Sequence, residues 1–460
     1  MPRGGKRGRG GASASLNLNP ALVPVSLSQT YPFQPTKVQT SILETQNIEL
    51  KPVNSISNPV TILEFIFKSE EFYLDLSKVL LKLTFEVKTS TGAALPATDV
   101  TTGLINNIPS SMLSRVECYL QERNVQTSCD LYHIRSYLET LLNYSDSSAD
   151  GKLGYGIFSK DTAGKTQSAG ADNEGWSNRR KHIVSSAKGG LVSTVMHPLH
   201  LDISTADALM INGVTLRIRL VFAQPSFYVW NALPATTGAT IEQSKVLIHD
   251  ASLILTTVTL VPDVVLSNER LLDQTPARYP IKRTDVRSFL TPASGHQISI
   301  PNAFLGSLPS HLCVGLFNAK HIGAPTHATN PLELLHMSFK GANFYINSNC
   351  ISMGTVTSDA YGGLTPIFYQ LYSSLGLLKG NDNIMINYDD FRAGFFILSL
   401  DLTSTLQSTS EEFVSLNLSG NVRIEIDFEQ ALSGDNILTV ILSWFPGALE
   451  VSKERMVNIE

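Results

Sequence analysis

The chain carries one order of apolar patterns twice, once in each half. The first half has an alternating strand at 81–87, an amphipathic helix, and further strand patterns at 199–204 and 213–220. The second half repeats the helix at 364–375 and the strand patterns at 398–403 and 420–427. Apolar and polar residues that alternate with a period of two are typical of strands with one face in a core and one in water. The duplication therefore predicts two similar β-sandwiches in tandem.

Length and charge agree with two large β domains. β-Sandwiches often reach ~200–250 residues as single domains, so 460 residues accommodate two. Charged residues make up 16% of the chain, against ~25% in an average globular protein. Such a surface indicates coverage by partners. The formal net charge of -5 argues against general phosphate binding by the folded body.

The pattern divides the chain into an arm and two domains. Residues 1–45 are rich in Gly, Arg, Ser and Pro and are expected to form a flexible N-terminal arm, with strands beginning at Thr61. The first sandwich is assigned to 46–265 and the second to 266–460, with a break in the strand pattern near 262–280. A Gly/Ser/Asp-rich excursion at 145–190 is expected to be a surface decoration with short structure around 155–158.

Each half has one amphipathic helix in a connecting loop. Thr365 is the expected N-cap of the second helix, with Pro366 at its first position. Apolar stripes three or four residues apart are expected to pack both helices against a sandwich. The stripes are Leu131, Ile134, Leu138 and Leu142 in the first helix, and Leu364, Ile367, Phe368, Leu371 and Leu375 in the second.

The cysteines and the apolar stretches indicate a reducing, aqueous compartment. Cys118, Cys129, Cys313 and Cys350 form no CxxC pair and are expected to be buried thiols. No apolar region follows the basic residues after Met1, so no signal peptide is expected. The apolar stretch at 253–261 is interrupted by Thr and stopped by Pro262, too short for a membrane span. We expect synthesis in the cytosol and a soluble product.

Four groups could carry chemistry, but each has a simpler interpretation. The 164–166 sequence Gly-Lys-Thr resembles the end of a phosphate-binding loop, but position 159 is Ser where that loop needs Gly. His197, His200 and Asp202 could supply metal ligands. In a strand, however, His200 and Asp202 would share a face without His197, so ordinary histidines are favoured.

The remaining candidates are also interpreted as structural. His321 and His327 flank a Gly/Pro loop and are expected to be ordinary loop histidines. The adjacent carboxylates at 389–390 and 411–412 are expected to be solvated, because acid/base pairs act from opposite sides of a cleft. We expect no catalytic residue, no metal site and no cofactor.

One basic cluster has a claim to a nucleic-acid role. It consists of Arg3, Lys6, Arg7 and Arg9, spaced by glycine in the arm. Such a cluster could neutralise phosphates, lock neighbouring subunits, act as a nuclear import signal, or be a solvated tail. The basic triplet at 179–181 is expected to be a charged surface turn.

The second half resembles the hexon-like major capsid proteins of adintoviruses and Maverick/Polinton elements, and adomavirus hexons are similar. The segments that carry the resemblance recur in the family's order over 279–460: 279–286, 304–309, 314–316, 330–331, 400–403 and 420–425. The resemblance implies two eight-stranded jelly rolls and homotrimers with a six-sided outline. Such trimers would tile an icosahedral shell around double-stranded DNA, with vertex (penton) and minor capsid proteins as partners.

Two other classes of protein remain open. One is a two-domain β-sandwich carbohydrate-binding or carbohydrate-active protein, a lectin or a cupin, which would gather aromatic and carboxylate side chains in one cleft. The three tryptophans are instead scattered at 176, 230 and 444. The other is a minor capsid protein. The duplication favours the major capsid role and makes a sharp prediction: the strand with Leu216, Ile218 and Leu220 should occupy the same place as that with Val422, Ile424 and Ile426.

Overall fold

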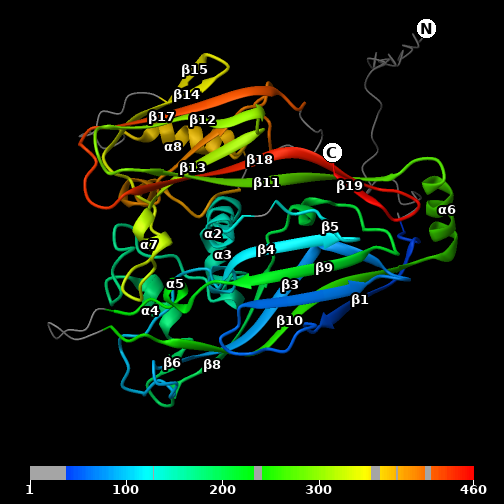
Figure 1. Ribbon diagram of the computed structural model, residues 1–460, viewed down its shortest axis with the longest axis horizontal. Helices are drawn as coiled ribbons and strands as arrows, with labels where there is room; N and C mark the ends of the chain where they lie inside the picture. The colour runs from blue at the N-terminus through cyan, green and yellow to red at the C-terminus, as the bar shows by residue number, and fades with distance from the viewer. Residues whose placement is uncertain are drawn as a thin grey trace, which may run out of the picture. The chain divides into compact units, whose positions relative to one another are not determined.

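A computed structural model describes residues 38–127, 129–232, 241–353, 363–379, 382–409 and 416–459. The chain divides into two units, residues 1–41 and 42–460. The architecture below is that of the second unit. It is built mostly of antiparallel β-sheets with short helices in the connections (Figure 1).

The first sandwich consists of two four-stranded sheets. One sheet has the order β1 (Ile42–Leu50), β10 (Lys245–Leu260), β3 (Tyr73–Lys88), β8 (Val192–Pro198). The other has the order β2 (Ile62–Lys68), β9 (Thr215–Phe222), β4 (Leu113–Leu120), β5 (Arg123–Asn124).

The second sandwich repeats this arrangement strand for strand. Its first sheet has the order β11 (Ala277–Thr291), β18 (Ile437–Val451), β13 (His311–Asn318), β16 (Ile397–Asp401), and β19 (Val457–Ile459) also pairs with β18. Its other sheet has the order β12 (Gln297–Ser307), β17 (Ser419–Phe428), β14 (Phe339–Ile346), β15 (Asn349–Ser352). Both sandwiches are therefore eight-stranded jelly rolls.

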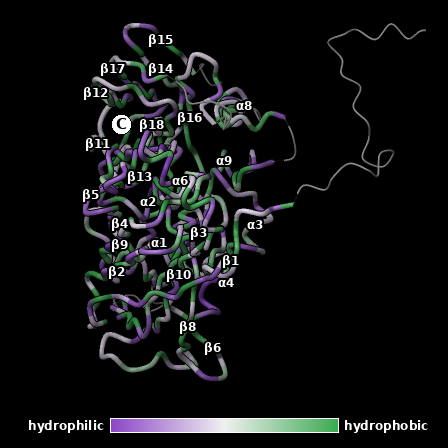
Figure 2. Tube along the Cα trace, turned by 90° about the vertical axis from the view of Figure 1, so that its right-hand side faces the viewer, coloured by the Kyte–Doolittle hydropathy of each residue, from purple (hydrophilic) through white to green (hydrophobic). Residues whose placement is uncertain are grey.

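The predicted equivalence of two strands is confirmed in detail. β9 lies between β2 and β4, and β17 lies between β12 and β14. The aliphatic side chains of both strands are buried: Leu216, Ile218 and Leu220 in β9, and Val422, Ile424 and Ile426 in β17. Even the outward faces agree, because Arg217 stacks on Tyr119 and Arg423 stacks on Tyr345 at matching register positions. Figure 2 shows hydrophilic and hydrophobic residues interspersed along the strands.

The two predicted helices occur at the same place in the strand order. α2 (Tyr132–Asn143) and α8 (Thr365–Ser374) each lie between the fifth and sixth strands of a jelly roll. The predicted cap of α8 is wrong by one residue: Leu364 is the N-cap, so Thr365 begins the helix and Pro366 follows in the first turn. Residues 132–142 of α2 are all buried, whereas in α8 only Ile367, Leu371 and Ser374 are.

Two strand predictions are wrong. The segment 199–204 is not a strand, because β8 ends at Pro198 and a 3-10 helix, η2 (Asp202–Thr205), follows. The amide of Leu199 still donates to the carbonyl of Val79 at 3.2 Å, and the chain then turns into η2. Of the corresponding sequence at 398–403, residues 398–401 do belong to β16, which ends at Asp401. Strands also begin earlier than Thr61, because residues 42–45, assigned to the arm, start β1.

The connections hold the remaining elements. α6 (Pro262–Leu272) joins the two jelly rolls, where the sequence predicted only a break in the strand pattern. The excursion at 145–190 contains α3 (Ser147–Asp150), η1 (Gly154–Gly156), α4 (Glu174–Arg180), β6 (Val184–Ser185) and β7 (Gly189–Gly190). The other short helices are α1 (Ile108–Ser111), α5 (Pro225–Tyr228), α7 (Ala319–Gly323) and α9 (Tyr388–Ala393).

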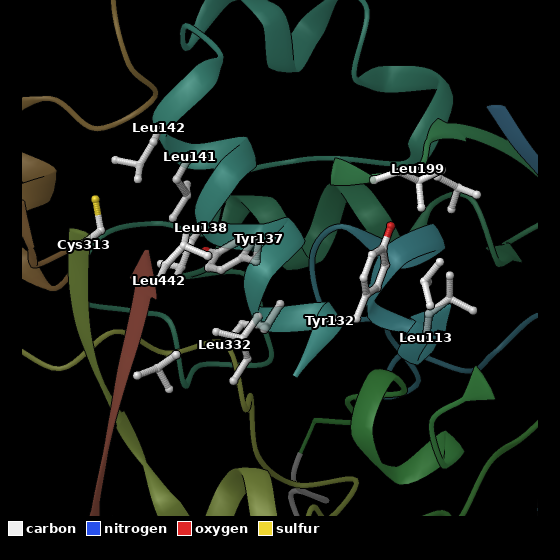
Figure 3. Packing of buried hydrophobic residues seen from close by; sticks show 14 of the residues in the cluster. Leu113, Tyr132, Tyr137, Leu138, Leu141, Leu142, Leu199, Cys313, Leu332 and Leu442 are labelled. Carbon is white, nitrogen blue, oxygen red and sulfur yellow. The ribbon is translucent and has the colours of Figure 1, made fainter. Parts of the chain in front are cut away.

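One hydrophobic cluster runs through both jelly rolls. It includes Leu138 and Leu141 of α2 together with Cys313 of β13 and Leu442 of β18. Figure 3 shows these side chains close together, so the helix of the first jelly roll packs toward a sheet of the second. Each of these leucines contributes ~1.5–3 kcal/mol when it is fully buried. Within the described part of the chain, no helix is long and apolar enough to cross a membrane.

Candidate functional site

Several buried polar groups lie at the seam, which we define as the contact between the two jelly rolls. The basic residues Arg3, Lys6, Arg7 and Arg9 lie outside the described residues, as do the carboxylates at 411–412. All four cysteines are free thiols. Cys118 and Cys313 are buried as predicted, but Cys129 is half-buried and Cys350 is exposed.

His197, His200 and Asp202 do not converge on one point. The Nδ1 of His197 lies 2.7 Å from the carbonyl oxygen of Pro198. The Nδ1 of His200 lies 2.6 Å from a carboxylate oxygen of Glu139 on α2. Asp202 points to a different partner. Across the described residues, no group of three or more His, Cys, Asp and Glu side chains is arranged to hold a metal ion.

Asp202 belongs to a buried ionic network that joins α2 to η2. Arg135 of α2 donates to Asp202 at 2.8 Å and to Glu139 at 3.0 Å. The three side chains are 9% exposed or less. Breaking a buried pair by removing one partner costs ~3–5 kcal/mol, because the remaining charge is left without compensation. The network therefore holds the helix and the loop after β8 in one geometry.

Burial and pairing compete in this network. Burial alone would raise the pKa of Glu139, but Arg135 and His200 outweigh it and lower that pKa to about 2. Burial raises the pKa of Asp202, against the opposing effect of Arg135. Both carboxylates accept charge-assisted hydrogen bonds in a dry environment, where such bonds are strong.

The same loop covers the free edge of β11. The amide of Thr284 donates to Asp202 at 3.3 Å, and the amide of Lys282 donates to the hydroxyl of Thr205 at 2.9 Å. Near the start of β11, the hydroxyl of Tyr279 accepts from the amide of Ile211 at 3.1 Å and donates to the carbonyl of Leu209 at 3.2 Å. Side chains and loops of the first jelly roll thus satisfy part of an edge strand of the second, whose far end stays open, with Leu290 at 63% exposed.

The excursion at 145–190 is not the surface decoration that the sequence predicted. The guanidinium of Arg179 is fully buried and pairs with Asp161 at 2.6 Å, while Trp176 is 3% exposed. Asp161 also accepts from the side-chain amides of Asn173 at 2.9 Å and Asn330 at 3.4 Å. Asn330 belongs to the second jelly roll, so this buried charge lies at the seam. The basic triplet at 179–181 is therefore not a simple surface turn.

Further bonds join the excursion to the second jelly roll. The side-chain amide of Gln167 donates to the carbonyl of Asn330 at 2.7 Å and accepts from its amide at 2.9 Å. Lys160 pairs with Asp390 at 2.9 Å, so Asp390 is not simply solvated as predicted, whereas Asp389 is 78% exposed. Two-way amide pairing of this kind fixes orientation as well as distance.

The 164–166 sequence and the two loop histidines also make contacts at the seam. The Thr166 hydroxyl donates to Glu333 at 3.1 Å. His327 Nδ1 lies 3.0 Å from the carbonyl of Val229, and the His327 carbonyl accepts from the amide of Asn231 at 2.7 Å. His321 Nδ1 lies 3.4 Å from the amide nitrogen of Gln167. The sequence did not identify these contacts, although the apolar residues of the excursion, such as Trp176, signal a packed segment.

A cavity of about 370 Å³ remains within the seam. Its lining includes Arg135, Glu139, His200, Lys282, His311 and Trp444. The rings of His311 and Trp444 stack with centroids 4.9 Å apart, and burial lowers the pKa of His311 to about 4. The Nε2 of His311 lies 2.8 Å from the hydroxyl of Ser399. His311, Ser399 and Trp444 all belong to one sheet of the second jelly roll, so these contacts order that side of the cavity.

Sequence comparisons found no matching protein-family model and no matching curated protein. Solved structures do match. A chain in the 3.5 Å cryo-electron microscopy structure of the Sputnik virophage has a TM-score of 0.65 at 11% identity, over 95% of this chain and 93% of that one. The mavirus major capsid protein has a TM-score of 0.52 at 12% identity, over 96% of each chain. The Faustovirus major capsid protein has a TM-score of 0.54 at 8% identity, over 91% of this chain and 92% of that one. At such identities the likeness is one of fold: the chain is a double jelly roll.

Proposed function

We propose that this protein is the major structural protein of a viral capsid. The observation that carries the proposal is the pair of matching jelly rolls, which shares its fold with the mavirus and Faustovirus major capsid proteins over more than nine-tenths of each chain. The polar seam supports it, because a shell subunit needs two domains in a constant relative position. The proposed role is structural and involves neither catalysis nor a cofactor.

The finer proposal concerns assembly. Three copies of a chain with two equivalent domains provide six similar units, so a homotrimer would have the six-sided outline that tiles an icosahedral shell. Heterologous contacts between copies close into a ring when the rotation allows it. We infer that the shell encloses double-stranded DNA and includes penton and minor capsid proteins as partners. The resemblance of 279–460 to adintovirus and Maverick/Polinton capsid proteins supports that lineage, with adomaviruses as relatives.

The N-terminal arm is also given a role in this proposal. Arg3, Lys6, Arg7 and Arg9 are spaced by glycines and carry positive charge. They would contact genomic DNA or lock a neighbouring subunit, because cations neutralise phosphates without reading sequence. The mature protein would reside in the virion, after synthesis in the host cytosol and assembly in the host nucleus.

The mass of the purified protein in solution tests this proposal. Light scattering behind size-exclusion chromatography should give about three times the 50.2 kDa of one chain at micromolar concentration and neutral pH. Negative-stain micrographs should show six-sided particles. A monodisperse species at the mass of a single chain would contradict the trimer.

A further inference from the structure

The cavity at the seam is large enough to hold a small molecule. Its volume of about 370 Å³ lies in the range of ~300–1,000 Å³ that is typical of ligand pockets. A second hollow of about 440 Å³ adjoins it, and Lys152 and Asp382 give that hollow one charge of each sign. Six residues line both spaces: Leu142, Asn143, Tyr144, Lys282, Leu375 and Thr409. The walls come from both jelly rolls, so a molecule bound there would contact both.

His200 has an unused ring nitrogen beside this cavity. Its Nδ1 lies 2.6 Å from a carboxylate oxygen of Glu139, which is charged at neutral pH, so the ring proton is on Nδ1. Its Nε2 is buried and has no hydrogen-bond partner among the residues that the structure describes. Buried polar atoms are nearly always paired with protein or water. An unpaired nitrogen in the lining of a cavity therefore indicates a partner that enters the cavity.

Ser408 has an unused hydroxyl in the lining of the same cavity. Its backbone amide donates to Asp401 at 2.8 Å. Its hydroxyl oxygen is buried and, within the described ranges of the chain, has no hydrogen-bond partner. Ser408 follows β16 of the second jelly roll, whereas His200 follows β8 of the first. One cavity therefore has two unpaired polar side chains, one from each jelly roll.

Lys282 of β11 adds a positive charge that has no direct partner. It lines both spaces, and its side chain makes no ion pair or hydrogen bond with any described residue. The carboxylates of Glu139 and Asp202 already accept hydrogen bonds from Arg135 and from other donors. Burial and, to a smaller extent, the charge of Lys282 lower the pKa of His311 to about 4, so His311 is neutral at pH 7. The groups left without partners are an ammonium, a hydroxyl and an imidazole nitrogen, which together suit an oxyanion.

We propose that this cavity binds a phosphate group, either free or at the end of a small molecule, through Lys282, Ser408 and His200. The ammonium of Lys282 and the hydroxyl of Ser408 donate to phosphate oxygens. The Nε2 of His200 accepts the P–O–H proton when the ring is neutral and donates to a phosphate oxygen when the ring is charged. Phosphate monoesters keep such a proton in part near neutral pH, because their second pKa is ~6. A carboxylate has no such proton at neutral pH, so the three groups favour a phosphate.

A phosphate held in this way would join the two jelly rolls. His200 belongs to the first, and Lys282 and Ser408 belong to the second. A ligand that binds the folded chain and not the unfolded chain raises the free energy of unfolding by an amount that depends on its concentration relative to Kd. Phosphate should therefore stabilise the protein in a saturable way. The inference is independent of the proposed capsid function.

Calorimetric titration of the purified full-length protein with inorganic phosphate, and separately with glycerol 3-phosphate, tests the proposal. Saturable binding to one site per chain is expected, together with a rise in the thermal unfolding temperature. Lys282→Met should weaken binding about tenfold, as expected for the loss of one charge-assisted hydrogen bond. Lys320→Met removes the same charge at a side chain that is 69% exposed and lines neither space, so this matched control should bind as the unmodified protein does.

Ser408→Ala separates binding from folding. The change removes a buried hydroxyl that has no partner among the described residues, so the protein without phosphate should be at least as stable as the unmodified protein. The affinity for phosphate should nevertheless fall about threefold, because one hydrogen bond to the ligand is lost. Unchanged affinity in both Ser408→Ala and Lys282→Met would overturn the proposal.

The remaining outcomes identify the ligand or refute the site. Tighter binding of glycerol 3-phosphate than of inorganic phosphate would assign the cavity to a phosphorylated small molecule, and equal binding would assign it to phosphate itself. If neither compound gives saturable heat, the cavity holds water alone and the proposal is wrong. If phosphate stabilises Lys282→Met and Lys320→Met equally, the stabilisation is the general effect of an excluded salt, which also refutes the site.

Discussion

Removing the buried carboxylate of Asp161 should destabilise the whole double jelly roll. Asp161 is 1% exposed and pairs with the fully buried guanidinium of Arg179. After Asp161→Ala, Asn173 retains the carbonyl of Lys165 and Asn330 retains that of Thr166 as acceptors. The main loss is therefore the partner of the Arg179 charge. Removing one partner of a buried pair costs ~3–5 kcal/mol in free energy of unfolding. Arg179 keeps the carbonyls of Leu104 and Ser159, which favours the lower half of that range.

A double-mutant cycle separates the pair from general damage. The variant Asp161→Leu with Arg179→Met removes both charges and should cost clearly less than the sum of the two single changes. Urea unfolding can be followed by tryptophan fluorescence, since the buried Trp176 lies on the same helix as Arg179. Asp389→Ala, at a side chain 78% exposed, is the control and should change stability by less than ~1 kcal/mol. A loss below ~1 kcal/mol for Asp161→Ala, or additive single changes, would refute the reasoning.

Three further outcomes are expected. Deleting residues 2–37 should leave the thermal unfolding transition unchanged, whereas deleting 2–50 should lower it because β1 is lost; equal transitions in calorimetry would contradict this. Pairing lowers the pKa of Glu139 from 4.5 to about 2, so its contribution to stability is complete above pH 4.5 and is lost as the pH falls toward 2. Glu139→Gln should therefore make the free energy of unfolding less dependent on pH in that window. Burial lowers the pKa of His311 from 6.5 to about 4, so the free energy of unfolding should fall as the pH drops from 6.5 to 4. The urea midpoint of His311→Gln should depend less on pH in that range. An unchanged pH dependence of the midpoint would contradict this prediction.

The candidate site could be predicted only in part. The sequence predicted Asp202 to be a strand residue near two histidines. In the structure its carboxylate accepts a hydrogen bond from the Thr284 amide of β11 and pairs with Arg135. Nothing in the local sequence around 202 indicates Arg135, which is 67 residues away. The excursion at 145–190 was misinterpreted for the same reason. Its Gly, Ser and Asp residues resemble a solvated loop until Asp161, Arg179 and Asn330 are brought together.

The sequence by itself determined the local periodicities and therefore the two tandem β-sandwiches. Alternation in β9 and β17 decides which residues face a core, because a shift of one residue would turn Leu216 or Val422 into water. Whether 199–204 or 398–403 becomes a strand depended on where pairing ends, which the pattern alone did not reveal. Only the tertiary structure decided the seam, because its bonds join segments more than sixty residues apart and follow from how one jelly roll packs on the other. For the same reason, only the tertiary structure distinguishes α2, which is buried there, from α8, which is left open.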